Sequence, residues 1–251
     1  MKNFKLLLII FISLNLCFCA SSQKKLEKQK EKDPQYQYKK AVIAMKYGLL
    51  DEAIRNLTRA LTLDESHYQS YNLLGLAYLK KGKFEEAAQA YRKRLQFQPQ
   101  SAEAHFNLGY IYEKRGSMDK AVTHYKKAFT LDKNPKASLN IAEIYFKQEK
   151  LKEALGYVRK SIQEKSSAGA YNLQGVLLNK MGKYPQAIES FKKAKEINPQ
   201  NNFIKVNLGM AYFNNQDYEQ ARALFKKMLP QIKDSKLKDR VQKYIERLEE
   251  K

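Results

Sequence analysis

Few residues in this chain have both the type and the spacing that chemistry requires. The three histidines, His67, His105 and His124, lie at unrelated positions of the pattern described below and form no metal-ligand set. No glycine-rich phosphate loop or nucleophile motif is present. The only cysteines, Cys17 and Cys19, stand near the N-terminus and are candidates for modification. We therefore expect a non-enzymatic protein with no catalytic residues, no cofactor and no metal site.

The rest of the sequence is organised by an alanine that recurs at a nearly fixed interval. Successive alanines are separated by 34, 34, 33, 33 and 34 residues. A period of this size indicates a stack of similar supersecondary units. In such a stack each unit contacts only its neighbours, and the array presents an extended surface to a partner. The alanines are Ala53, Ala87, Ala121, Ala154, Ala187 and Ala221.

Other positions recur in the same register when each repeat starts 19 residues before its alanine. Small residues let two helices approach closely, large apolar residues fill the seam between them, and glycine permits the left-handed turn that ends a helix. Each repeat is therefore predicted to be a helix–turn–helix hairpin. The eighth position is Ala41, Gly75, Gly109, Ala142, Gly175 and Gly209. The fifteenth is Gly48, Gly82, Gly116 and Gly182, with Glu149 and Gln216 as departures that should weaken their repeats. The twenty-fourth is Leu57, Tyr91, Tyr125, Val158, Phe191 and Phe225.

These columns resemble the tetratricopeptide repeat (TPR) family. The resemblance implies an all-α fold, a right-handed superhelical solenoid of about six helix hairpins with a C-terminal capping helix. The cap is expected because Leu237, Val241, Tyr244, Ile245 and Leu248 form one apolar stripe. The predicted organisation is a signal peptide at 1–18, a lipidated tether at 19–33, repeats at 34–67, 68–101, 102–134, 135–167, 168–201 and 202–235, and the cap at 236–251.

The N-terminus has the pattern of a targeting segment. Lys2 and Lys5 precede an apolar run, LLLIIFISL, which is short for a bilayer-spanning helix. Cys19 and the small residues after it resemble the lipobox of bacterial lipoproteins, which implies lipidation of Cys19. Phe18 departs from that pattern, because lipoboxes carry a small residue there. Cys17, an ordinary cleaved signal and a retained anchor are therefore alternatives.

The resemblance also implies that the first helices line a concave groove for a partner peptide. Asparagine amides can hold a peptide backbone, and aromatic side chains can anchor its side chains. The asparagines on this surface include Asn72, Asn107, Asn140, Asn172 and Asn207. The predicted partner groove is Tyr38, Val42, Leu76, Phe106, Asn107, Tyr110, Lys114, Asn140, Phe146, Lys147, Val176, Lys180, Met210 and Phe213.

Charge leaves two further questions open. The net charge of +21 indicates a bias toward acidic partners or anionic surfaces. Lysine occupies the thirteenth position in five consecutive repeats, where it either complements the helix dipole or forms a ladder for an acidic ligand. Basic pairs on the second helices form a ridge that is either a solvated face or a contact for anionic lipid headgroups. The pairs are Arg92-Lys93, Lys126-Lys127, Arg159-Lys160, Lys192-Lys193 and Lys226-Lys227.

Together these features predict an exported, envelope-bound lipoprotein that acts as a protein–protein adaptor. Six repeats after a lipobox-like start are similar to the pilotin lipoproteins of type IV pilus systems, which implies a role in secretin or pilus assembly. The expected location is the outer membrane or cell envelope, facing the periplasm, with surface exposure as a variant. The expected partners are a protein or peptide and the membrane, but no nucleic acid. The alternative is an anionic-surface-binding protein that acts through the basic ridge.

The anchor can be tested by metabolic labelling with a radioactive fatty acid. The wild-type protein should carry the label, and Cys19→Ser should remove it, because the thiol that carries the lipid is lost. Cys17→Ser is the matched control and should keep the label. The reverse pattern would move the site to Cys17, and an unlabelled wild type would contradict the lipoprotein interpretation.

Overall fold

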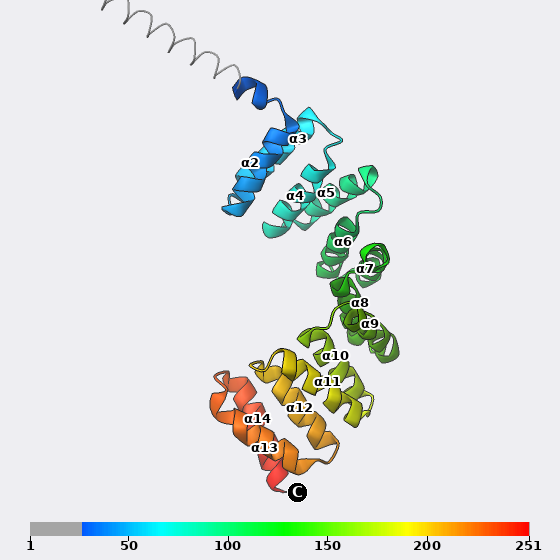
Figure 1. Cartoon of the computed structure of the whole chain (residues 1–251), viewed down its shortest axis with the longest axis vertical. Coiled ribbons are helices and arrows are strands. Elements are labelled where there is room, and N and C mark those ends of the chain that lie inside the picture. The colour runs from blue at the N-terminus through cyan, green and yellow to red at the C-terminus, as the bar shows by residue number, and fades with distance from the viewer. Residues whose placement is uncertain (1–26, 251) are drawn as a thin grey trace, which may run out of the picture. The chain divides into compact units, whose positions relative to one another are not determined.

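The computed structural model describes residues 27–250, and every regular element in that range is helical. This confirms the predicted all-α fold. The predicted signal peptide and both cysteines lie outside the described residues. The chain divides into two compact units, one ending at Ile111 and the other beginning at Tyr112, so the division falls inside helix α6 (Ala102–Lys114) (Figure 1).

The first unit contains two complete helix hairpins and the greater part of α6. In each hairpin the two helices pack closely against each other, and α3 of the first hairpin packs against α4 of the second. One apolar cluster joins them, because Ala41 and Leu57 of the first hairpin meet Leu74 and Ala77 of the second. The helices are α2 (Pro34–Lys46), α3 (Leu50–Leu63), α4 (Tyr68–Lys80) and α5 (Phe84–Phe97).

The second unit continues with the end of α6, helix α7, three further helix pairs and the capping helix. Neighbouring hairpins again contact each other through consecutive helices. Helix α13 ends at Met228 and is followed by a short 3-10 turn that contains Pro230. Proline has no backbone N–H to continue the α-helical hydrogen bonds. The elements are α7 (Met118–Asp132), α8 (Pro135–Lys147), α9 (Leu151–Glu164), α10 (Ala168–Lys180), α11 (Tyr184–Ile197), α12 (Asn202–Asn214), α13 (Tyr218–Met228), η1 (Leu229–Gln231) and α14 (Ser235–Glu249).

The recurring small residues allow the close approach of the two helices of a hairpin. All six alanines that define the period are 0% exposed. A Cβ atom placed on Gly175 would lie 2.6 Å from the ring of Phe191, a distance that real Cβ contacts do not reach. Glycine therefore stands at the eighth position where the twenty-fourth is an aromatic ring. In the first and fourth hairpins, where Leu57 and Val158 replace the ring, alanine is accommodated.

The turn between the helices of a hairpin keeps one conformation even where glycine is absent. Gly182 has a φ of 74°, in the left-handed region. Glu149 and Gln216 occupy the same position in other hairpins with φ of 60° and 66°. A left-handed non-glycine residue is strained unless its surroundings hold it. The hydrogen bonds are conserved in both turns, since the residue after each one bonds back to Tyr145 O or Tyr212 O at 2.9 Å.

The helix α14 closes the second unit at its C-terminal end. Leu237, Val241, Ile245 and Leu248 are buried against α12, α13 and η1, in one cluster with Phe225 and Met228. The remaining α14 side chains are mostly charged and exposed. A polar outer face of this kind is what the terminal element of a repeat array requires.

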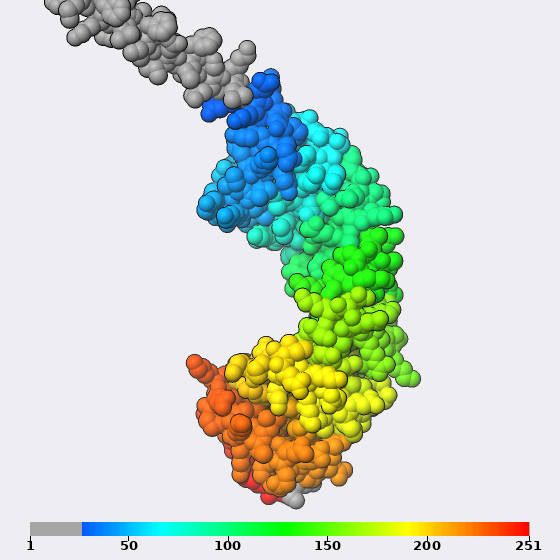
Figure 2. Space-filling view, in the orientation of Figure 1, coloured from blue at the N-terminus to red at the C-terminus, as the bar shows by residue number. Residues whose placement is uncertain are grey.

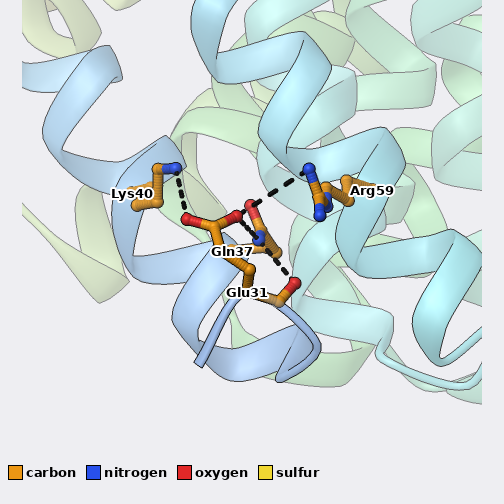
Figure 3. A network of polar contacts seen from close by, with 4 residues as sticks. All are labelled: Glu31, Gln37, Lys40 and Arg59. Atoms are coloured by element: carbon orange, nitrogen blue, oxygen red, sulfur yellow. Dashed lines mark hydrogen bonds and ion pairs between the residues drawn. The ribbon is translucent and has the colours of Figure 1, made fainter. Parts of the chain in front are cut away.

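The segment before α2 belongs to the lipidated tether predicted at 19–33, and the structure describes it from residue 27 onward. Residues 27–30 are helical, and Glu31 is fixed to the first hairpin (Figure 3). Its carboxylate lies 3.1 Å from Lys40 Nζ and 3.8 Å from Arg59. Gln37, which is 0% exposed, donates from Nε2 to the carbonyl and the carboxylate of Glu31 at 2.9 and 2.7 Å. We call these four residues the Glu31 clamp.

The clamp is also reflected in the acid–base behaviour of Glu31. Hydrogen bonds from Gln37 and Lys40 lower the pKa of the Glu31 carboxyl. Asp33 then caps α2 by accepting a hydrogen bond from Gln35 N at 2.9 Å.

No helix among residues 27–250 is both long and apolar enough to cross a bilayer.

The contact between the eighth and twenty-fourth positions predicts opposite effects on stability for two glycine substitutions. Gly175→Ala forces a methyl group into the buried ring of Phe191 and should lower stability by about 1–3 kcal/mol, as overpacking does. Gly156→Ala, inside α9 with open space around its Cβ, should raise stability by about 0.5–1 kcal/mol because alanine loses less entropy. Urea unfolding followed by circular dichroism measures both. Equal stabilities would contradict the assigned packing.

Candidate functional site

The first helices of successive hairpins lie side by side in the second unit, where α10 contacts both α8 and α12. Two amide hydrogen bonds join α10 to α12. Asn207 Nδ2 donates to Asn172 Oδ1 at 3.0 Å, and Asn214 Nδ2 donates to Asn179 Oδ1 at 3.1 Å. An amide offers two donor hydrogens and two acceptor lone pairs, so these bonds use only part of each group. The remaining capacity suits the backbone of an extended ligand.

The lysines at the thirteenth position are joined to acids of the preceding hairpin. Lys180 Nζ lies 2.6 Å from the carboxylate of Glu149, and Lys147 Nζ lies 3.7 Å from that of Glu113. Lys180 also lies over the ring of Phe146, 5.4 Å from its centroid. The ladder in the second unit is thus a row of mixed charge rather than a purely basic surface. All five lysines stand in the last turn of a first helix: Lys46, Lys80, Lys114, Lys147 and Lys180.

Two carboxyl groups near the start of this surface were missed by the sequence analysis. Glu113, at the end of α6, accepts a hydrogen bond from the Tyr125 hydroxyl at 2.9 Å. Glu143 is an exposed residue of α8, yet the pKa of its carboxyl is raised, chiefly because its surroundings partly desolvate the carboxylate and also because Glu113 is close. Lys147 acts in the opposite direction. The sequence did contain a signal for Glu143, because it occupies the ninth position of its repeat, as several predicted groove residues do.

The apolar residues of the predicted groove divide into two groups in the second unit. Phe146 and Val176 are half-buried and pack at the edge of the α8–α11 core. Met210 and Phe213 instead contact the capping helix. Arg240 of α14 lies 2.8 Å from Met210 Sδ, and the ring of Phe213 lies 5.6 Å from that of Tyr244. α14 packs beside them, where a further first helix would lie, and their place in the partner groove stays a prediction.

The first unit presents its own set of predicted groove residues. The ring of Tyr38 lies 5.4 Å from that of His67, so Tyr38 packs against the connection between hairpins. Val42 and Tyr110 are 42% and 37% exposed. The half-buried members are Leu76, Phe106 and Asn107. In the second unit Asn140 is also half-buried, on α8.

The basic ridge on the second helices is exposed, and several of its members have partners. Lys93 pairs with Glu65 at 3.2 Å. Lys126 lies over the rings of Tyr145 and Tyr157, 5.9 and 6.0 Å from the centroids, and the Tyr145 hydroxyl raises its pKa. Lys160 lies 4.7 Å from the Tyr157 centroid. These contacts are those of a solvated face that is held in place by its neighbours.

The histidines occupy three unrelated environments. His67 bonds to Ser70 Oγ at 2.8 Å and to Gln35 Oε1 at 3.0 Å. His105 Nε2 lies 3.3 Å from the carbonyl of Pro99, and the ring of His124 stacks on Tyr112. Within residues 27–250 no group of histidine, cysteine and acidic residues could hold a metal ion.

The alternating helices and their small-to-aromatic contacts define a helical repeat protein, and comparison with known families specifies its class. A TPR repeat model matches residues 77–116, and tetratricopeptide repeat models match 102–135, 168–201 and 205–230. A TPR repeat-containing protein of Methanocaldococcus jannaschii is 33% identical over 107 residues, 41% of this chain. The match spans only 18% of that relative's length. The chain is a tetratricopeptide repeat protein.

Solved structures share this fold. The pilF protein of Pseudomonas aeruginosa has a TM-score of 0.70 at 17% identity, covering 85% of this chain and 98% of that one. YrrB, a TPR protein with an unusual peptide-binding site, has a TM-score of 0.59 at 23% identity, covering 72% and 94%. A TPR protein of Parabacteroides merdae gives 0.66 at 18%, covering 86% and 88%. At these identities the likeness establishes the fold, and the TPR class supports a protein–protein interaction scaffold.

The raised pKa of Glu143 makes its effect on stability depend on pH. A carboxyl group whose pKa is higher in the folded state costs stability once it ionises, and that cost disappears when it is protonated. Glu143→Gln should therefore raise the unfolding midpoint at pH 7 and leave it unchanged below about pH 4, near the ordinary glutamate pKa.

Thermal unfolding at several pH values measures the Glu143 effect. Glu246→Gln, on the exposed face of α14, is the matched control and should show no such dependence. A lower midpoint for Glu143→Gln at pH 7 would mean that the attraction of the Glu143 carboxylate to the Lys147 charge outweighs the desolvation.

Proposed function

We propose that this protein is a non-enzymatic adaptor of the bacterial envelope that binds a segment of a partner protein on its first helices. The observation that carries the proposal is the linked surface of α8, α10 and α12. There the asparagine pairs Asn172–Asn207 and Asn179–Asn214 set partly used amides in register. Regularly spaced amides match the regularly spaced N–H and C=O groups of a peptide backbone.

The side chains around this surface indicate what the bound segment would contain. Phe146 and Val176 offer half-buried apolar area, which suits an apolar or aromatic anchor. Glu143 and Glu113 lie close enough for their carboxylates to repel each other. A lysine or arginine of the partner would relieve that repulsion, since an opposite charge favours the ionised form. We therefore infer a segment that combines an apolar anchor with a basic residue.

The location in the envelope rests on the N-terminal pattern. A positive start, a short apolar run and Cys19 followed by small residues favour an exported chain with a lipid anchor. The likeness to pilF, which covers 98% of that chain, supports the narrower proposal of a pilotin-like role in secretin or pilus assembly. The anchor would hold the protein at the outer membrane, facing the periplasm.

A binding comparison between the two helical faces tests the adaptor proposal. The partner is first identified by crosslinking in the intact envelope and then purified. Phe146→Ala should weaken its binding by at least about 2 kcal/mol, roughly thirtyfold, because anchor residues carry most of the energy of such interfaces. Calorimetry on the purified proteins measures the change.

The matched control reverses charge on a second helix of the same unit. Lys226 and Lys227 are both exposed on α13, and Lys226→Glu with Lys227→Glu should leave partner binding nearly unchanged. Circular dichroism establishes that both variants are folded. If the α13 variant loses binding while Phe146→Ala keeps it, the basic ridge is the working surface and the groove mechanism is wrong.

A further inference from the structure

The outer face of α2 is exposed at a position that every other hairpin buries. Ile43, the tenth residue of the first repeat, is 57% exposed. The residues at the same position in the later repeats are all 0% exposed: Ala77, Ile111, Ile144, Leu177 and Ala211. For Ala77, Ile144, Leu177 and Ala211, the second helix of the preceding hairpin packs on the helix that carries the residue. Among the described residues no hairpin precedes α2 (Figures 1 and 2).

Loss of a neighbour does not by itself account for the apolar character of this face. Tyr47 and Leu49, which follow Ile43 closely, are 70% and 52% exposed. The positions of Leu49 in the other repeats hold Lys83, Ser117, Lys150, Lys183 and Asp217. Four of the five positions equivalent to Tyr47 are also polar: Lys81, Arg115, Gln148 and Asn215. The first hairpin thus carries exposed apolar side chains where its sister hairpins carry polar ones.

This face begins where the chain enters the first unit. Tyr36, Lys40, Ile43 and Tyr47 follow at helical spacing along one side of α2. Lys40 lies over the ring of Tyr36, 5.7 Å from its centroid, and pairs with Glu31 of the clamp. The clamp therefore fixes the entering chain beside the start of this stripe.

The remaining length of tether keeps the face near the anchor. From Cys19 to the first described residue the chain advances eight residues, which span at most about 29 Å when fully extended. The anchor would therefore limit how far residue 27 lies from the bilayer, and the stripe extends from there along α2 by about 1.5 Å per residue.

We propose that the face formed by Ile43 of α2, with Tyr47 and Leu49 just after that helix, lies in the interfacial layer of the membrane that holds the anchor. This inference rests on the proposed lipidation of Cys19. Tyrosine favours the headgroup level of a bilayer, and short apolar stretches enter its boundary. Lys39 and Lys46, exposed on the same helix, suit anionic headgroups.

A second copy of the chain fits this face less well. A stable protein interface buries about 800 Å² on each partner, more than three partly exposed side chains can supply. A membrane contact needs no such area, because the anchor already supplies a high local concentration. The face would set how the first hairpin meets the bilayer, while the lipid supplies the attachment.

The chain contains no tryptophan, so one introduced tryptophan reports on its own surroundings. The full chain carrying Tyr47→Trp is expressed in a bacterial host, extracted and reconstituted into vesicles of phosphatidylethanolamine and phosphatidylglycerol. Some of the acyl chains carry bromine near the headgroup, which quenches tryptophan on contact. Phe203→Trp, at a side chain 61% exposed on α12, is the matched control.

The inference predicts a blue shift and a loss of emission for tryptophan at 47 in brominated vesicles, with no such change at 203. Adding Ile43→Glu and Leu49→Glu should abolish the quenching at 47 while the protein still sediments with the vesicles. A protein that sediments with vesicles but keeps full emission at 47 would overturn the inference and leave the anchor intact.

Two other outcomes identify different failures. If Cys19→Ser leaves sedimentation with vesicles unchanged, the proposed anchor is wrong and the tether argument fails with it. If the blue shift at 47 occurs without vesicles and grows with protein concentration, a second copy covers the face. That result would also overturn the membrane contact.

Discussion

The whole structure depends on one steric relation inside each hairpin, between the small residue at its eighth position and the large one at its twenty-fourth. A ring such as Phe191 occupies the space that a Cβ atom of Gly175 would need. Where the partner is Val158 rather than an aromatic residue, Ala142 fits in place of glycine. This relation fixes how closely the two helices approach, and the buried alanine of the period does the same one turn away. Because the two helices of each hairpin pack against each other through their own residues, similar hairpins can be stacked one after another.

Stacking brings first helices together and so creates a surface that no single repeat possesses. The links between α10 and α12 join residues 35 positions apart through pairs of asparagine amides. Lys180 reaches Glu149 in the preceding hairpin, across 31 positions. Polar bonds of this kind keep the surface ordered without burying it. They also give it alternating donors, acceptors and charges, which suits recognition of a segment of chain and supplies no reactive group.

Within the described part of the chain, the apolar surface of the last hairpin is covered by a further helix, whereas that of the first hairpin is not. At the C-terminal end α14 covers Met210 and Phe213 and presents a charged outer face to solvent. At the N-terminal end Glu31 and Gln37 fasten the incoming chain to the first hairpin but leave Ile43 and Tyr47 exposed. The two ends therefore differ in surface chemistry. The capping helix covers the apolar core at the C-terminal end, whereas apolar side chains stay exposed on the first hairpin. That asymmetry is the physical basis for the membrane contact that we propose at the N-terminal end.

The sequence by itself determined the all-α hairpin architecture and the buried positions, because one steric rule repeats every 33 or 34 residues. It did not determine which polar side chains meet. Glu149 and Gln216 hold the left-handed turn that the pattern assigns to glycine, since the surrounding hydrogen bonds hold the backbone there. The Lys180–Glu149 pair, the cover of α14 over Phe213 and the Glu31 clamp were decided only by tertiary structure. Long polar side chains and terminal segments have no period to follow, so their partners depend on which groups the stacked helices bring within reach.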